Sequence, residues 1–182
     1  SLIEIHHDGR RYRLADQRGE AGFRELMKWQ FSGGRARWPR WIENKLYPAP
    51  PRTVAGNAMN LTWIGHSTAL IQTAGLNILT DPFLSSRASP TQWAGPRRVR
   101  APGISADALP PIDIVLISHN HYDHLDLPAL SQIFRHHQPH IVTPAGNAVH
   151  IRKANRRQDV DELRWGGSIQ SGPAKLTLTP AL

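Results

Sequence analysis

The side chains best suited to chemistry lie close together in one stretch, SHNHYDHLD at residues 118–126. This stretch follows the apolar run DIVLI at 113–117. It contains four residues of metal-binding type, His119, His121, Asp123 and His124. Neutral imidazoles and carboxylates are ligands that zinc and similar divalent ions accept. His119 and His121 can point to the same side of an extended segment, and the other two can turn toward a neighbouring point. The spacing therefore predicts two adjacent metal ions, which would activate water and hold a phosphoryl or carbonyl oxygen.

The composition narrows the kind of metal site and the class of protein. The sequence has no cysteine, so His, Asp or Glu must hold any metal. Its 182 residues, 40% hydrophobic and 20% charged, are typical of one globular domain. A net charge of +8 favours anionic partners. No apolar run approaches the roughly 20 residues of a membrane span, and the amino terminus lacks the order of a secretory signal. We therefore expect a cytoplasmic protein, with peripheral contact at a membrane as a second option.

The elements that must position these side chains alternate between strand and helix. We predict strands at 60–65, 68–74, 76–81 and 113–118, a helix at 127–137, a strand at 140–144, a helix at 146–155 and a hairpin at 168–180. This order predicts the α/β class, with a mixed sheet and flanking helices. Open α/β sheets place ligand sites outside the carboxyl ends of their strands. His119 stands at such an end.

The amino-terminal part of the sequence differs from the rest. Residues 1–57 hold three of the six tryptophans among many arginines, and we predict a short helix at 22–31. We interpret 1–57 as a basic, Trp-containing arm that wraps onto a domain formed by 58–182. Within that domain, residues 85–104 are rich in Pro, Gly, Ser and Arg, so we expect a long loop.

Longer stretches of the sequence resemble a known family. HNHYDH at 119–124 is similar to the HxHxDH signature of the metallo-β-lactamase fold superfamily. TWIGHSTALIQ (62–72), LNILTDPFLSSRASPTQWAGPRRVR (76–100) and LPPIDIVLISHNHYDHLD (109–126) resemble the branch of N-acylphosphatidylethanolamine-hydrolysing phospholipase D and its bacterial relatives. The resemblance implies the amino-terminal half of a metallo-β-lactamase αββα sandwich, with domain 58–182 truncated at its carboxyl end.

The resemblance also implies two zinc ions per complete site. His119 and His121 match ligands of the first ion, and Asp123 and His124 match ligands of the second. Family members supply the remaining ligands from later segments, so this chain is expected to provide only part of the set. A catalytic zinc normally has three protein ligands and a water. We therefore expect a fragment, or a homodimer or second chain that completes the site; His150, expected to face solvent in mid-helix, does not complete it.

Three more residues receive roles from the resemblance. Asp81 is expected to support the histidine loop through hydrogen bonds, although alone it would suggest a turn aspartate before a proline. His66 is expected near the metal cleft in contact with substrate and is counted with Asp123 as catalytic, although alone it would suggest a core histidine. Tyr122 is expected in the pocket wall.

The resemblance implies a function for the intact protein, and alternatives stay open. It implies a zinc-dependent hydrolase of phosphodiester bonds, phospholipase D-like, acting on lipids of the N-acylphosphatidylethanolamine type. One alternative is a lactonase or phosphoesterase with a small soluble substrate. Another is an incomplete, non-catalytic half-domain that binds a partner or dimerises. The basic arm favours an anionic lipid surface. Nucleic acid is the least favoured partner, because RRVR at 97–100 is a short patch without interleaved aromatic residues.

Overall fold

The computed structural model describes residues 5–7, 12–14, 22–33 and 38–180. The chain forms two compact units, Ser1–Trp38 and Pro39–Leu182. In the first unit, β1 (Ile5–His7) pairs antiparallel with β2 (Tyr12–Leu14). The same unit contains α1 (Phe23–Phe31), which confirms the helix predicted at 22–31.

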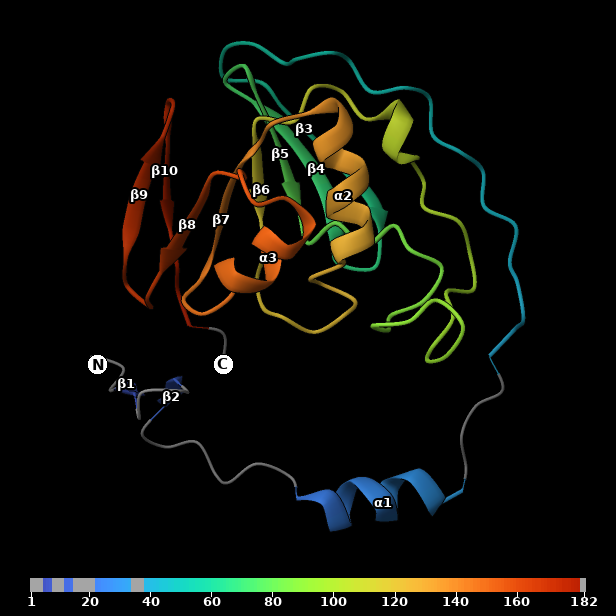
Figure 1. The fold of residues 1–182 in the computed structure, drawn as a ribbon. Coiled ribbons are helices and arrows are strands. Elements are labelled where there is room, and N and C mark those ends of the chain that lie inside the picture. Colours follow the sequence, from blue (N-terminus) through green and yellow to red (C-terminus); the bar gives the residue numbers. More distant parts are fainter. Residues whose placement is uncertain (1–4, 8–11, 15–21, 34–37, 181–182) are drawn as a thin grey trace. The chain divides into compact units, whose positions relative to one another are not determined.

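A six-stranded mixed sheet forms the framework of the second unit (Figure 1). Its strands in spatial order are β3 (Met59–Gly65), β4 (Thr68–Thr73), β5 (Leu76–Thr80), β6 (Ile114–Leu116), β7 (His140–Pro144) and β8 (Val160–Leu163). Neighbouring strands are antiparallel from β3 to β5 and parallel from β5 to β8. The predicted mixed sheet is therefore confirmed, although β8 was not predicted and β6 is shorter than 113–118.

Two helices cover one face of this sheet, as Figure 1 shows for α2 (Leu127–His136) and α3 (Ala148–Ala154). Buried apolar side chains of the helices pack against buried apolar side chains of the central strands. The helices contribute Leu130, Ile133 and Ile151, and the strands contribute Leu70, Leu79, Val115 and Ile141. Burial of such side chains is the main stabilising contribution to this layer. Among the described residues, no helix has the length and apolar character needed to cross a membrane.

The other described elements are short. A single 3-10 turn, η1 (Ala106–Ala108), precedes β6. After β8, the strands β9 (Ser168–Ser171) and β10 (Ala174–Thr177) form the predicted antiparallel hairpin. His140 at the start of β7 lies 2.8 Å from the Ser171 hydroxyl and 2.8 Å from a carboxylate oxygen of Asp161. These contacts join the hairpin to the parallel part of the sheet.

The later part of the predicted arm lies along the second unit. The backbone N–H of Ile42 donates to the carbonyl of Val99 at 2.7 Å, and that of Tyr47 donates to the carbonyl of Gly103 at 3.0 Å. Residues 42–54 therefore wrap onto the domain, as expected for this part of the arm. The division of the chain into domains at residues 57 and 58 stays a prediction.

Strand direction brings three connections to one edge of the sheet. Because β3 is antiparallel to β4, and β4 to β5, the strands β3, β5 and β6 all run the same way. Their carboxyl ends lead into the turn at residues 65–67, into Asp81 and into the histidine loop, which we define as residues 118–126. This is the edge at which parallel sheets place their ligand sites.

A buried carboxylate fixes the far end of the histidine loop. Asp126 is the N-cap of α2 and accepts the backbone N–H of Ala129 at 3.0 Å. It also accepts the backbone N–H groups of Leu84 at 3.1 Å and Ser85 at 2.8 Å, and the Ser85 hydroxyl at 2.7 Å. One side chain thus caps the helix and ties it to the chain that follows β5.

We predict that Asp126→Ala lowers the free energy of unfolding by roughly 2–4 kcal/mol, because buried donors lose their acceptor. Urea unfolding followed by circular dichroism would measure the change. Asp107→Ala is the matched control, since its side chain is 88% exposed and surface changes usually cost less than about 0.5 kcal/mol. Equal losses in the two variants would contradict this role for Asp126.

Candidate metal centre

The buried carboxylate of Asp81 organises the start of the histidine loop. It accepts the backbone N–H of Ser118 at 2.7 Å, the Ser118 hydroxyl at 2.6 Å and the Nδ1–H of His124 at 2.9 Å. The Asp81 backbone has a φ of 35°, in a region that non-glycine residues rarely adopt. Its N–H donates to the Leu116 carbonyl, and its own carbonyl accepts the Thr68 hydroxyl at 2.7 Å. These hydrogen bonds are compatible with the supporting role expected for Asp81, which stays a prediction.

These hydrogen bonds determine which imidazole nitrogens carry protons. An ionised carboxylate only accepts, so the Ser118 hydroxyl and His124 Nδ1 both direct a proton toward Asp81. The Ser118 oxygen can then accept from Nδ1 of His119, which lies 2.9 Å away. Nε2 of His119 and Nε2 of His124 then carry no proton, which is the form in which imidazole binds a metal. In this structure Nε2 of His119 also lies 3.0 Å from Nδ1 of His121. Ser118 was not among the predicted site residues, although it is the polar residue that separates the apolar strand from His119.

The first two predicted ligands face each other. His119 Nε2 lies 3.0 Å from His121 Nδ1, and the rings of His119 and His124 have centroids 3.9 Å apart. Partial burial lowers the pKa of His119, and the nearby His124 and His121 lower it further, although Asp81 and Asp123 oppose the change. The lowered pKa favours the neutral imidazole, which is the form competent to bind a metal.

The other two predicted ligands form a cluster with His66. The ring N–H at His66 Nε2 donates to Asp123 at 2.8 Å, and His124 Nε2 lies 3.7 Å from the same oxygen. One ligand atom of each residue lies within 4.8 Å of the others. Partial burial acts to raise the pKa of Asp123, but a backbone hydrogen bond, the charge of His124 and the His66 hydrogen bond together hold it below its ordinary value. Asp123 is therefore an ionised acceptor in this cluster.

His66 is held at an unusual backbone position from two sides. Its φ is 53°, and its carbonyl accepts the indole N–H of Trp63 at 2.8 Å. The Phe83 ring stands edge-on to the imidazole, with centroids 5.8 Å apart, and the Arg98 guanidinium lies 4.6 Å from the centroid of Phe83. Burial lowers the pKa of Arg98, against the attraction of Asp126. Arg98 and Phe83 were also missed, because only the fold brings the loop at 85–104 back to this edge.

The donor set fits a divalent metal. It consists of imidazole nitrogens and carboxylate oxygens, which suit zinc, iron and similar ions. The predicted ligands are grouped in two adjacent pairs, His119 with His121 and Asp123 with His124. The structure adds His66 to the second pair at ligand distance, whereas the resemblance assigned it to substrate. The ligand roles of all five residues stay predictions.

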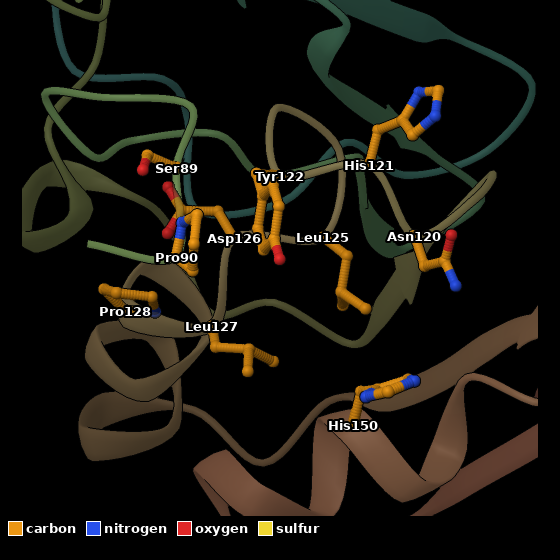
Figure 2. A pocket seen from close by; sticks show the side chains of 10 residues that line it. All are labelled: Ser89, Pro90, Asn120, His121, Tyr122, Leu125, Asp126, Leu127, Pro128 and His150. Atoms are coloured by element: carbon orange, nitrogen blue, oxygen red, sulfur yellow. The ribbon is translucent and has the colours of Figure 1, made fainter. Parts of the chain in front are cut away.

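Tyr122 lies on the outer side of the histidine loop. Its ring is exposed and lines a pocket together with Asn120 and His121 (Figure 2). Its position is therefore compatible with the pocket-wall role expected from the resemblance. His150 also lines this pocket, from α3. His150 is half-buried at this pocket, and the expectation that it faces solvent stays a prediction.

Comparisons with known proteins match the part of the chain that carries this site. The family described as "Beta-lactamase superfamily domain" matches residues 76–182. An uncharacterized protein of Mycobacterium tuberculosis is 38% identical over 136 residues, which are 73% of this chain and 37% of that protein. N-acyl-phosphatidylethanolamine-hydrolyzing phospholipase D 1 of Caenorhabditis elegans is 39% identical over 115 residues, 60% of this chain and 32% of that protein.

Two further comparisons concern proteins whose names mention a metal. A metal-dependent hydrolase of Anaeromyxobacter is 31% identical over 140 residues, 74% of this chain and 46% of that protein. The crystal structure of CmlA, a diiron beta-hydroxylase from Streptomyces venezuelae, has a TM-score of 0.52 and 26% identity, covering 70% of this chain and 25% of that one. The chain thus spans 32% to 46% of the length of the curated relatives described above.

We predict that the His119 ring titrates below the ordinary histidine value of 6.5 in the folded, metal-free protein. Burial and the neighbouring imidazoles disfavour its protonated form. A pH titration of the ring signals by NMR would give the midpoint, and the same ring in the urea-unfolded chain is the reference. A midpoint at or above that reference would show that the environment of His119 is not as described.

We further predict that Asp81→Asn weakens metal binding by about 10- to 100-fold, the usual effect of losing a partner that orients a ligand. The carboxylate uses both oxygens as acceptors, one for the Ser118 N–H and the other for the Ser118 hydroxyl and His124, whereas an amide has one acceptor oxygen and would turn its NH2 group toward a donor. Competition with a chromophoric zinc chelator would measure the affinity, with Asp107→Asn as the surface control. Unchanged affinity in Asp81→Asn would rule out this orienting role.

Proposed function

This chain belongs to the Beta-lactamase superfamily, and from that premise we propose that the protein containing it is a metal-dependent hydrolase of phosphodiester bonds. The observation that carries the proposal is the convergence of His119, His121, Asp123 and His124 at one sheet edge, with Asp81 directly behind them. Such a cluster, oriented by a buried carboxylate, resembles the arrangement of metal ligands and their hydrogen-bond partners in metalloenzymes.

We propose zinc as the metal, with iron as the alternative, since a structural neighbour is described as diiron. His119 and His121 would hold one ion, and Asp123 and His124 a second. Ions at these positions would supply Lewis acidity to a phosphoryl oxygen and lower the pKa of a water. The histidine loop provides two ligands for each ion, and His66 lies at ligand distance for the second, so further ligands for the first ion would come from sequence or a chain outside these residues.

The residues around the ions would orient the substrate and move protons. Asp123 accepts from Nε2 of His66 at 2.8 Å, which leaves Nδ1 of His66 with a lone pair. That nitrogen could take a proton or, once protonated, deliver one to the oxygen of a leaving group. Asp81 and Ser118 hold the histidine loop in place before any substrate arrives, which limits the reorganisation needed during reaction.

The substrate class that we propose is a phospholipid of the N-acylphosphatidylethanolamine type, cleaved in the manner of phospholipase D. The name and 39% identity of the C. elegans relative support it. The loop at 85–104 supports it independently, because Trp93 is 81% exposed and Arg97 and Arg100 are exposed as well. An indole beside cations suits the surface of an anionic membrane. A small soluble phosphoester or lactone is the alternative substrate.

A second candidate function, partner binding, is favoured by the edge strand β3. Its alternate residues Met59 and Leu61 are both 65% exposed, and Trp63 is 53% exposed. An apolar row on an edge strand is a common site for contact with another chain or segment. Contact there with a second chain or a second copy could bring the missing ligands to the histidine loop.

We predict that the complete gene product hydrolyses N-acylphosphatidylethanolamine, loses this activity after chelation and regains it with zinc or iron. Asp123→Asn and His119→Ala should each lower kcat/KM by about 100-fold or more. The control, Asp107→Asn, should leave kcat/KM unchanged because its carboxylate is on the surface.

Three results would count against this proposal. Activity that survives chelation would remove the metal from the reaction. Full activity in both site variants would place the reaction elsewhere. Hydrolysis of lactones without hydrolysis of phosphodiesters would favour the alternative substrate class.

A further inference from the structure

A pocket of about 430 Å³ lies beside the histidine loop. Figure 2 shows its lining side chains, which come from three segments: the loop itself with the start of α2, the Ser89–Pro90 turn, and His150 on α3. Pockets that bind small molecules are usually about 300–1,000 Å³ in volume and mostly apolar. The pocket is therefore large enough to accept part of a substrate.

Apolar groups contribute more of the pocket surface than polar groups do. Leu125 is buried, and Leu127 and Pro128 continue the surface into the first turn of α2. Pro90 adds a further apolar contribution from the long loop. Asp126 also borders the pocket, but its carboxylate is occupied by hydrogen bonds from the backbone and from Ser85. A wall of this kind favours hydrocarbon rather than a charged group.

The loop wall of the pocket is held by a close backbone approach. Gly95 has a φ of 91°, and a Cβ atom at this position would lie 2.7 Å from the Cβ of Ser89. The N–H of Ala88 donates to the carbonyl of Pro96 at 3.0 Å, which closes this part of the loop. Ser89 and the proline that follows it are thereby kept at the pocket by local packing.

The polar residues of the pocket connect it to the metal centre. His121 lines the pocket, and its Nδ1 is also 3.0 Å from His119 Nε2 in the metal cluster. Tyr122 and Asn120 border the pocket on the same loop, and His150 faces them from α3 in Figure 2. Within the described part of the chain, no side-chain hydrogen bond engages the His150 ring. A ligand lying in the pocket would therefore have one end next to the proposed metal ligands.

We propose that this pocket is a subsite for an alkyl or acyl chain of the substrate, with the polar end of that chain directed toward His121. The inference rests on the proposed function, because it assumes that the reacting group lies at the histidine cluster. It deepens that function by making the apolar chain a determinant of affinity and by adding His150 to the residues that contact substrate.

Binding of two homologous ligand series tests the subsite without any turnover. Normal alcohols from butanol to decanol probe the apolar wall alone, and the matching monoalkyl phosphates probe the wall together with the metal centre. Calorimetry on the zinc-loaded complete gene product, below micelle-forming concentrations, would give each Kd. We expect Kd to fall in both series as the chain lengthens, by up to about fourfold for each methylene that becomes buried.

Substitutions on α3 provide a matched pair. His150→Trp would fill the pocket and should abolish the dependence of Kd on chain length, while methyl phosphate binding stays unchanged. Val149→Trp places the same ring on the adjacent residue, which is 61% exposed and does not line the pocket. This control should keep the wild-type dependence. Pro90→Asp, in the exposed loop turn, is a second blocking variant in case His150→Trp does not fold.

The outcomes separate this inference from the proposed function. A Kd independent of chain length, or an unchanged dependence in both blocking variants, would overturn the subsite. A dependence seen with alcohols but absent with alkyl phosphates would overturn its connection to the metal centre. If both series show the dependence and no phosphodiester is hydrolysed, the subsite stands and the proposed reaction fails.

Discussion

The arrangement of the site depends on one buried carboxylate at the end of β5. Asp81 accepts both donors of Ser118 and the ring N–H of His124, so it holds the strand end and the histidine loop together. Through the Ser118 hydroxyl it also orients His119. The positive φ of Asp81 is an unfavourable backbone conformation, which the hydrogen bonds to neighbouring strands stabilise. Without this carboxylate, no acceptor would hold the proton on Nδ1 of His124 or, through Ser118, on Nδ1 of His119.

The sheet makes that carboxylate effective by bringing distant segments to the same edge. His66 and Asp123 are 57 positions apart in sequence and are joined by a 2.8 Å hydrogen bond. They meet because β3, β5 and β6 run the same way, so that the carboxyl ends of β3 and β6 lie at the same edge of the sheet, with β4 and β5 between the two strands. The helices α2 and α3 cover the face of these strands that carries Leu70 and Leu79. Trp63, which pairs with Ala69, is exposed on the other face.

Two carboxylates tie the histidine loop to the segment 81–85 that follows β5. Asp81, in that segment, accepts from Ser118 at the start of the loop. Asp126, at the end of the loop, accepts from Leu84 and Ser85 of the segment. A loop fixed in this way can present several ligands with little reorganisation. The pocket beside it has a different construction, since one wall belongs to the long loop at 85–104. The candidate metal ligands are thus placed on the loop held by two carboxylates, and the proposed chain-binding subsite also uses the long loop at 85–104.

Local sequence signals determined much of the fold and the composition of the site. Apolar periodicity and the turn at Ala74 and Gly75 predicted most strands and helices, because these signals act between near neighbours. Four of the candidate ligands could be found because they are adjacent in sequence. Only the tertiary structure decided that the acidic run VDEL is a strand, through its pairing with β7. It also decided that Ser118 links Asp81 to His119, that His66 meets the cluster and that His150 faces the pocket. These relations depend on strand order and helix rotation, which are set by packing between segments distant in sequence.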